Sequence, residues 1–165
     1  MGCHRVRRPQ WPGTAIVVNS PTSVFGLLNS FGGSAADPAS PSGPLMQGSD
    51  GVLYGTTMGG RAFGGGTVFR VTGSGETTVV HSVPANSAKE GTLPMGGVVE
   101  DNKGKLYGVT IAGGASSLGT VDVLTPDGKA KTLHRFTSTD AVVSPCDGMA
   151  LAADRNLWGV AARAA

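Results

Sequence analysis

The chain has 165 residues, of which 27 are glycine and 10 are proline, and its formal net charge is only +2. Hydrophobic residues make up 39%, so the composition excludes a wholly disordered chain, and the length favours a single domain. Glycine at this density beside valine, threonine and leucine favours an all-β protein with many short strands and tight turns.

Residues 1–12 form an atypical N-terminal segment that shares no pattern with the rest of the chain. Arg5, Arg7 and Arg8 lie together there, but no aromatic residues are interleaved with basic ones elsewhere, so nucleic acid is not an expected partner. The apolar blocks that follow, up to Leu28, are four or five residues long, shorter than the roughly 7–15 residues of a signal peptide's apolar region. We therefore expect no signal peptide, and no apolar run is long enough to span a membrane.

From residue 13 onward the chain repeats a pattern at an interval of 53 or 51 residues. Several independent columns recur at this interval, and a fixed period of this length indicates a repeat architecture. The recurring columns are Gly13-Thr14, Gly66-Thr67 and Gly119-Thr120; Pro41, Pro94 and Pro145; Tyr54, Tyr107 and Trp158; Gly75 and Gly128; and His81 and His134.

Each full unit contains four short strand-like segments joined by glycine-containing turns. Turns such as Asp50-Gly51 suit a chain reversal because glycine adopts positive φ. Four antiparallel strands in each repeat of about 40–55 residues are typical of a β-propeller blade. We predict strands at residues 45–47, 52–56, 67–71 and 77–83 in the first unit, and at 98–100, 105–110, 120–124 and 130–136 in the second.

The phase of the repeat predicts a repeat domain over residues 13–160 that starts and ends in the middle of a unit. Half a unit occupies 13–31, full units occupy 44–83 and 97–136, and a further half unit occupies 148–160. These pieces make about three blade equivalents, whereas propellers commonly have roughly four to eight. We expect an incomplete or open propeller that self-associates through its open blade edges, forms an open arc, or is a fragment of a longer repeat array. The fragment is preferred because both ends stop in mid-unit.

The stretch GSDGVLYGTTMGG at 48–60, with GGGTVFRVT at 64–72, resembles the GloVer-type tandem repeats of bacterial surface and secreted proteins. The resemblance covers roughly residues 13–160. It implies propeller-like repeats and an extracellular or cell-envelope location, and it brings no catalytic residues with it. The chain departs from the family at Asp122, which stands where the repeat has an aromatic residue such as Phe69.

The glycine-rich stretch GGRAFGGGT at 59–67 has the spacing of a phosphate-binding loop between Gly60 and Gly65. Gly66 stands where such a loop needs lysine, and the TVFRV that follows has the composition of a strand where a helix is needed. We expect a sharp reversal between two strands, which glycine permits. Binding of an anion by the backbone amides of this loop is the alternative.

The internal histidines, His81 and His134, are expected at equivalent points on the outermost strands of neighbouring units. No further ligand type recurs with them, so a structural role is preferred to a metal site. We expect neither a metal nor another cofactor.

Asp50, Asp127 and Asp147 each precede a glycine and are interpreted as turn residues. No run of the DxDxDG type accompanies them, so calcium is not expected. Cys3 and Cys146 lie far apart in the chain, and no cysteine–histidine ligand spacing is present. Their oxidation state stays open.

The aromatic column Tyr54, Tyr107 and Trp158 is expected to pack between blades. An aromatic platform for sugars is the alternative, and Arg61 and Phe63 at the tip of the glycine loop would extend it. No nucleophile elbow of the GxSxG type is present. The sequence therefore predicts no catalytic residue and identifies no ligand-binding residue.

The preferred function is that of a non-catalytic repeat module in a bacterial secreted or cell-surface protein, with a binding or display role. Glycans or other surface polymers are the expected partners, because loops on repeated scaffolds make specific contacts. The alternative is a propeller enzyme, a lyase or hydrolase acting on a carbohydrate or related substrate. It rests on analogy of fold and predicts His81 or His134 near acidic residues. A truncated reading frame without its own function is a third interpretation.

Overall fold

The computed structural model describes residues 13–19, 24–32, 37–60, 64–85 and 87–164. Within these ranges the chain forms twelve strands and no helix, which confirms the all-β prediction. The strands are β1 Gly13–Asn19, β2 Val24–Phe31, β3 Pro38–Gln47, β4 Leu53–Gly60, β5 Gly64–Val71, β6 Thr77–Pro84, β7 Gly91–Glu100, β8 Leu106–Gly113, β9 Thr120–Leu124, β10 Ala130–Arg135, β11 Val142–Leu151 and β12 Leu157–Ala164.

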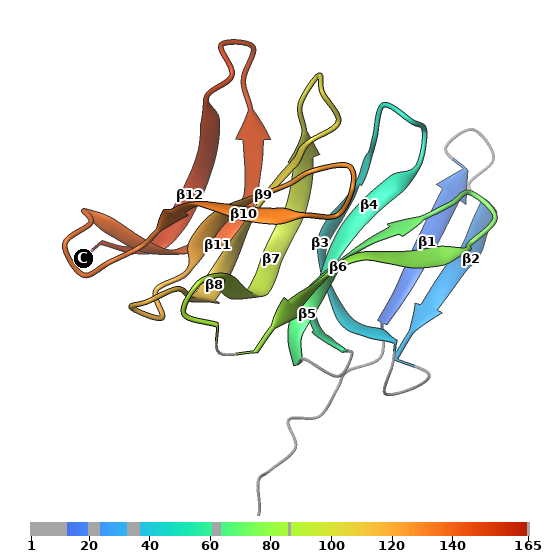
Figure 1. Ribbon diagram of the computed structural model, residues 1–165. Helices are drawn as coiled ribbons and strands as arrows, with labels where there is room; N and C mark the ends of the chain where they lie inside the picture. Colours follow the sequence, from blue (N-terminus) through green and yellow to red (C-terminus); the bar gives the residue numbers. More distant parts are fainter. Residues whose placement is uncertain (1–12, 20–23, 33–36, 61–63, 86, 165) are drawn as a thin grey trace, which may run out of the picture.

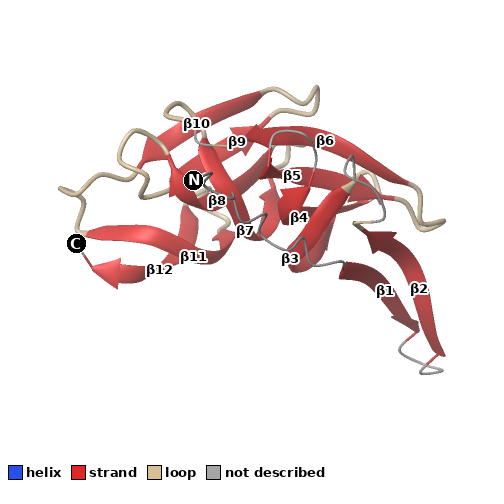
Figure 2. Ribbon diagram, turned by 90° about the horizontal axis from the view of Figure 1, so that it is seen from below, coloured by secondary structure: helices blue, strands red, loops and turns tan. Residues whose placement is uncertain are grey.

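The strands form four antiparallel sheets that follow one another along the chain. Two sheets have four strands, ordered β3-β4-β5-β6 and β7-β8-β9-β10, and two have only two strands, β1-β2 and β11-β12. Figure 1 shows the sheets side by side in a row, with β1-β2 at one end and β11-β12 at the other. Viewed from below in Figure 2, the row bends into an arc. The arrangement is that of an open, propeller-like repeat protein, as predicted.

The first strand of each unit is longer than its sequence suggests. The strand expected at 45–47 begins at Pro38, and the one expected at 98–100 begins at Gly91. Both strands are interrupted by a register shift against their partner, between Ser42 and Met46 in β3 and at the corresponding place in β7. β3 and β7 are edge strands of their sheets, and Pro41 and Pro94 pair regularly with Thr57 and Thr110. An edge strand tolerates proline because the missing N–H need not join the ladder, so proline does not end these strands.

The innermost strands of successive sheets approach one another through glycine. Gly43 and Gly96 have positive φ values of 81° and 69°. A Cβ atom added at Gly43 would collide with the backbone of Gly96, and one added at Gly96 would collide with the backbone of Gly148. These three glycines therefore bring β3, β7 and β11 into close backbone contact, which no larger residue would allow.

Two of the repeated sequence columns meet at the boundaries between sheets. A Cβ atom added at Gly66 would lie 2.6 Å from Cδ of Pro94 in the next unit, closer than real carbon contacts. The repetition of these residues thus reflects a repeated contact between units. The glycine of each Gly-Thr pair abuts the proline of the following unit: Gly13 with Pro41, Gly66 with Pro94, and Gly119 with Pro145.

The residue before each of these prolines also has an unusual backbone conformation. Ser40, Leu93 and Ser144 have φ values of 57°, 59° and 56°, in the left-handed region that residues other than glycine seldom adopt. Such strain is commonly associated with a functional site. Here it recurs in three successive units, so it belongs to the geometry of the repeat.

A buried pair of threonines links the second and third strands of each full unit. The hydroxyls of Thr57 and Thr67 are 2.7 Å apart, and those of Thr110 and Thr120 are 2.8 Å apart. In each pair the first hydroxyl also accepts the backbone N–H of the second threonine, at 3.1 Å. Burial of a hydroxyl is costly unless it is hydrogen-bonded, and the two hydroxyls of each pair are hydrogen-bonded to each other.

The hydrophobic core lies between the sheets and is divided into two clusters. The first, between β1-β2 and β3–β6, contains Ala15, Phe31, Phe69 and Val71. The second lies between the two four-stranded sheets, and Tyr54, Val68 and Val80 pack against it from the first of them; its buried members are Val98, Leu106 and Leu124. Each unit thus covers the apolar face of the next, as expected of repeats that cannot bury that face alone.

Candidate functional site

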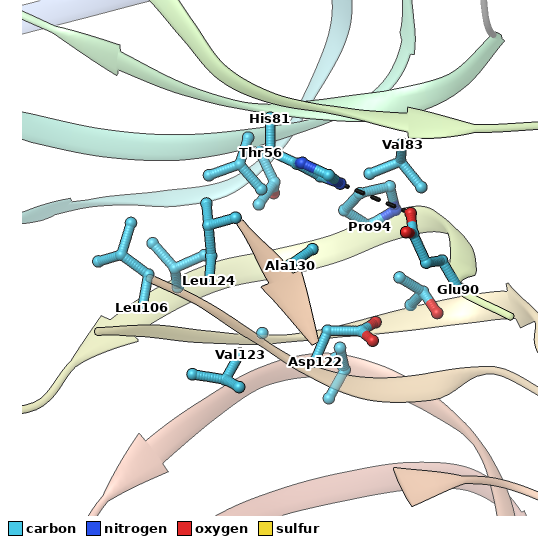
Figure 3. A pocket seen from close by; sticks show the side chains of 16 residues that line it. Thr56, His81, Val83, Glu90, Pro94, Leu106, Asp122, Val123, Leu124 and Ala130 are labelled. Atoms are coloured by element: carbon cyan, nitrogen blue, oxygen red, sulfur yellow. Dashed lines mark ion pairs between the residues drawn. The ribbon is translucent and has the colours of Figure 1, made fainter. Parts of the chain in front are cut away.

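A small cavity lies between the two four-stranded sheets. Its volume is about 50 Å³, enough for a few water molecules or a small chemical group, since one water needs roughly 10–15 Å³. Figure 3 shows the walls: His81 and Val83 come from β6 on one side, and Leu106, Asp122 and other residues of β7–β10 come from the other. The lining is mainly apolar, with three ionisable side chains, those of His81, Glu90 and Asp122.

The cavity exists because one aromatic residue of the repeat is replaced. In the preceding unit Phe69 is fully buried, and its ring packs on Phe31 with 4.9 Å between centroids. Asp122 occupies the same position in the next unit: Phe69 pairs with Gly55 across the ladder, and Asp122 pairs with Gly108. The shorter carboxylate cannot fill the space that the phenylalanine ring fills in the unit before.

The two cross-strand glycines confirm this difference in filling. A Cβ atom at Gly55 would lie 2.7 Å from Cζ of Phe69, so the ring covers this glycine. A Cβ atom at Gly108 would meet only Cγ1 of Val98, at 3.4 Å. Gly108 therefore borders the cavity. Gly55 and Gly108 occupy equivalent positions, but a ring fills the interface at Gly55 and no side chain fills the one at Gly108.

Two hydroxyls hold the Asp122 carboxylate in place. Thr132 donates a hydrogen bond to Oδ1 at 2.6 Å, and Thr120 donates to Oδ2. Burial raises the pKa of Asp122 above its usual value, and the negative charge of Glu90 acts in the same direction, whereas the two hydroxyl donors lower it. The result is a fixed hydrogen-bond acceptor in an apolar environment, with an increased tendency to bind a proton.

His81 and Glu90 form an ion pair at the same cavity. The Nε2 atom of His81 lies 3.6 Å from Oε2 of Glu90, and the two side chains are 21% and 35% exposed. Figure 3 shows His81 pointing from β6 toward Glu90, on the connection to β7, while Asp122 lies on the opposite wall. Two carboxylates and one imidazole therefore face a single small space.

The equivalent histidine, His134, has a different environment. Its Nε2 atom lies 3.4 Å from Oδ2 of Asp140, and its ring packs edge-on against Phe136 with 4.8 Å between centroids. His134 does not line the cavity. Both histidines lie on the outermost strands of their sheets, β6 and β10, and both are near an acidic residue, but only His81 lines the cavity.

The acidic residues before glycine have three different settings. Asp50 accepts a hydrogen bond from the Val52 amide at 3.0 Å and one from the Tyr54 hydroxyl at 2.8 Å, and these contacts lower its pKa. Asp127 lies in the β9–β10 turn, where hydrogen bonds from Lys129 and from a threonine lower its pKa to about 2. The turn interpretation is wrong for Asp147, which lies within β11.

The aromatic column occupies equivalent strand positions but has unequal surroundings. The Tyr54 and Tyr107 hydroxyls donate to Asp50 and Asp101, at 2.8 and 2.9 Å, and Tyr54 also packs against the second core cluster. Trp158, in β12, is exposed. Packing between blades thus holds for Tyr54 and not for Trp158, because the described chain has no full unit after β11-β12.

Less of the glycine-rich stretch 59–67 is loop than the sequence predicts, because strands extend into it from both sides. β4 continues through Gly60 and β5 starts at Gly64. Arg61 and Phe63, suggested as an extension of an aromatic platform, lie outside the described residues.

Cys146 is a free thiol whose Sγ lies 3.8 Å from the carbonyl oxygen of Val160, while Cys3 lies outside the described residues. Among the residues that the structure describes, no three histidine, cysteine or acidic side chains gather as a metal site would require. Likewise, none of the described segments is a helix able to cross a membrane.

Sequence reasoning identified Asp122 as a departure from the repeat but did not assign it to a site. The signal was present: a carboxylate stands where the neighbouring unit has a buried phenylalanine. Its consequence, a cavity that His81 and Glu90 also line, depends on how the two four-stranded sheets face each other.

A sequence family described as the Gloeobacter/Verrucomicrobia repeat matches residues 9–165, nearly the whole chain. No curated protein matches the chain significantly.

Proposed function

Because the chain belongs to the Gloeobacter/Verrucomicrobia repeat family, we propose that it is a non-catalytic repeat module of a bacterial secreted or cell-surface protein with a binding role. The observation that supports a binding role is the cavity at Asp122. Units of a purely structural array have no need to differ, whereas this unit replaces a buried aromatic residue with a carboxylate. The replacement leaves a cavity with a carboxylate in its wall at one of two otherwise similar interfaces.

The chemistry of the cavity favours a small group that donates hydrogen bonds. Asp122 and Glu90 are acceptors when ionised, and the rest of the lining is mainly apolar. A protonated amine on a short carbon frame meets both requirements, because a buried carboxylate gains most from a cationic partner. The cavity is too small for a sugar ring, so the proposed ligand is a surface polymer that inserts an amino group, such as a glycan with free amino sugars.

Binding of glucosamine oligomers, measured by titration calorimetry, tests this proposal. N-acetylglucosamine oligomers of the same length serve as the ligand control because their nitrogen carries no charge. We expect the amino form to bind and the Asp122→Phe variant to lose roughly tenfold or more in affinity, since the ring occupies the cavity. Asp127→Asn, an exposed acidic residue in the β9–β10 turn, is the matched control and is expected to bind normally. Equal affinity of the Asp122→Phe variant would contradict the proposal.

A second candidate function, a lyase or hydrolase acting on a carbohydrate, is favoured by the position of His81. Its imidazole and the Glu90 carboxylate share the cavity with an aspartate whose pKa is raised, and perturbed acid–base groups in a recess are candidates for proton transfer. This function predicts turnover of glycan substrates that is lost in His81→Asn and retained in His134→Asn. Binding without turnover by the unmodified protein supports the binding module instead.

A further inference from the structure

The large apolar side chains that remain exposed are concentrated at the two ends of the row of sheets. All are between 48% and 62% exposed, whereas Phe69 and Val109, which are equivalent to Ile16 and Val160, are buried in the full units. Single exposed apolar residues are ordinary, but groups of them indicate contact surfaces. They are Ile16, Val17 and Leu27 on β1-β2, Leu133 on β10, and Trp158 and Val160 on β12.

The two-stranded sheet at the start of the row corresponds to the third and fourth strands of a unit. The ladder between β1 and β2 shifts register between Ala15 and Ile16. The ladder between β5 and β6 shifts between Val68 and Phe69, which are the residues 53 positions later. This sheet therefore lacks the first two strands of its unit among the described residues.

The two-stranded sheet at the other end corresponds to the first and second strands of a unit. Its register shift lies between Pro145 and Met149, matching the shift between Ser42 and Met46 in the β3–β4 ladder. Within the described residues, the free edge of β12 and the free edge of β1 pair with no strand. These are the two edges that meet in the centre of a complete unit, as β4 meets β5 and β8 meets β9.

We propose that β12 of one copy of the chain pairs antiparallel with β1 of a second copy, and that the two half units form one composite four-stranded blade. The full units determine its register. Tyr54 lies opposite Arg70 and Thr57 opposite Thr67; by equivalence, Trp158 lies opposite Val17 of the second copy, and Ala161 lies opposite its Thr14.

The number of copies follows from the number of blades. One chain contributes two full units and two halves, so a closed ring of n copies contains three blades for each copy. Closed propellers commonly have roughly four to eight blades. Rings of one, two and three copies would have three, six and nine blades, and only two copies fall in this range. The contact is head-to-tail and closes after two copies, which gives two-fold symmetry.

The composite blade also covers three of the exposed apolar residues, Ile16, Leu133 and Trp158. Ile16 occupies the position of Phe69, which is buried against the preceding unit. Leu133 occupies the position of Val80, which packs against the following unit. In the ring, Ile16 and Leu133 meet across the interface between β7–β10 of one copy and β1-β2 of the other. Trp158 takes the position of Tyr54 and faces the next full unit.

Paired cysteines test the proposed register directly. In a background with Cys3→Ser and Cys146→Ser, the variant Val17→Cys/Trp158→Cys places two thiols directly opposite each other, with Cα atoms about 4.5–5.5 Å apart, within disulfide range. The matched control Thr14→Cys/Trp158→Cys moves one thiol three residues along the strand, about 10 Å away. We expect oxidation to yield covalent dimers in the first variant and no covalent dimers in the second.

Light scattering of the unmodified chain provides an independent measurement. The expected mass is twice 16.5 kDa, and Trp158→Ser with Leu133→Ser is expected to shift it toward one copy while circular dichroism of the variant keeps its strand signal. A monomer at all concentrations would overturn the proposal. A dimer whose covalent form appears equally with the displaced cysteine pair would overturn it as well.

Discussion

The two interfaces on either side of the β3–β6 sheet are built from the same repeat but are filled differently. On one side Phe69 packs on Phe31 and covers Gly55. On the other side Asp122 takes the place of the phenylalanine, and Gly108 borders a cavity. The comparison shows that one substitution in a repeat can leave a cavity with a carboxylate in its wall, where the other interface is packed, without changing the strand register. It also makes the first interface an internal reference for the second.

The largest expected effect is the loss of packing at the filled interface. Phe69→Ala is expected to reduce the free energy of unfolding by about 3–5 kcal/mol, because a fully buried aromatic ring is replaced by a void. Asp122→Ala is expected to cost far less, since a cavity is already present there. Urea denaturation of both variants measures the two losses of unfolding free energy. Equal losses would show that the interface at Asp122 is packed as tightly as the one at Phe69.

Filling the cavity should stabilise the protein. Asp122→Phe recreates the arrangement of the first interface, and Gly108 leaves room for the ring as Gly55 does. Burial of a phenylalanine contributes roughly 1.5–3 kcal/mol, and removal of a buried carboxylate adds to the gain. The unfolding midpoint in urea is expected to rise. A lower midpoint would mean that neighbouring residues prevent the ring from entering the space.

The two cross-strand glycines should differ in their tolerance of one methyl group. Gly55→Ala places Cβ 2.7 Å from both the Phe69 ring and Cδ2 of Leu45, and overpacking of this kind costs about 1–3 kcal/mol. Gly108→Ala meets only Val98, at ordinary contact distance, and is expected to be neutral or slightly stabilising. Thermal unfolding monitored by circular dichroism compares them, and a reversed order would contradict the equivalence of the two positions.

The smallest expected effect is the pH dependence that Asp122 introduces. Burial raises its pKa in the folded state, so the folded protein binds the proton more tightly than the unfolded chain does. The carboxylate therefore destabilises the fold above the raised pKa, and this penalty disappears as pH falls below the unfolded value. Asp122→Asn is expected to gain stability at neutral pH and to match the unmodified protein at acidic pH.

Asp50 serves as a control, because the pH dependence that it adds to the stability of the fold has the opposite sign. Its pKa is lowered by hydrogen bonds from Val52 and Tyr54, so its contribution to stability is present above the unfolded pKa and is lost as pH falls through the folded value. Asp50→Asn is expected to lose stability at neutral pH, with the difference shrinking in acid. Urea denaturation at several pH values would measure both variants, and curves of the same sign would refute the assigned environments.

Much of the fold could be predicted because its determinants are local. Asp-Gly and Pro-Asp-Gly turns specify chain reversals through the backbone freedom of glycine and the fixed φ of proline, and their spacing gave the strand count of each unit. The repeated Gly-Thr and proline columns were visible in the sequence, but their meaning was not. Only the structure shows that Gly66 abuts Pro94 in the next unit. The early start of β3 at Pro38 was missed because local rules would place Pro41 outside a strand, whereas β3 is an edge strand, in which proline is tolerated.

The sequence by itself determined the repeat, its period and its all-β character, since turn chemistry and strand propensity act over a few neighbouring residues. Only the tertiary structure decided which faces meet, that Asp122, His81 and Glu90 share one cavity, and that Trp158 stays exposed while Tyr54 packs against the next unit. These outcomes depend on whether a second sheet lies opposite a given side chain. That is a property of the assembled array, because the burial of a side chain is set by its neighbours in space rather than along the chain.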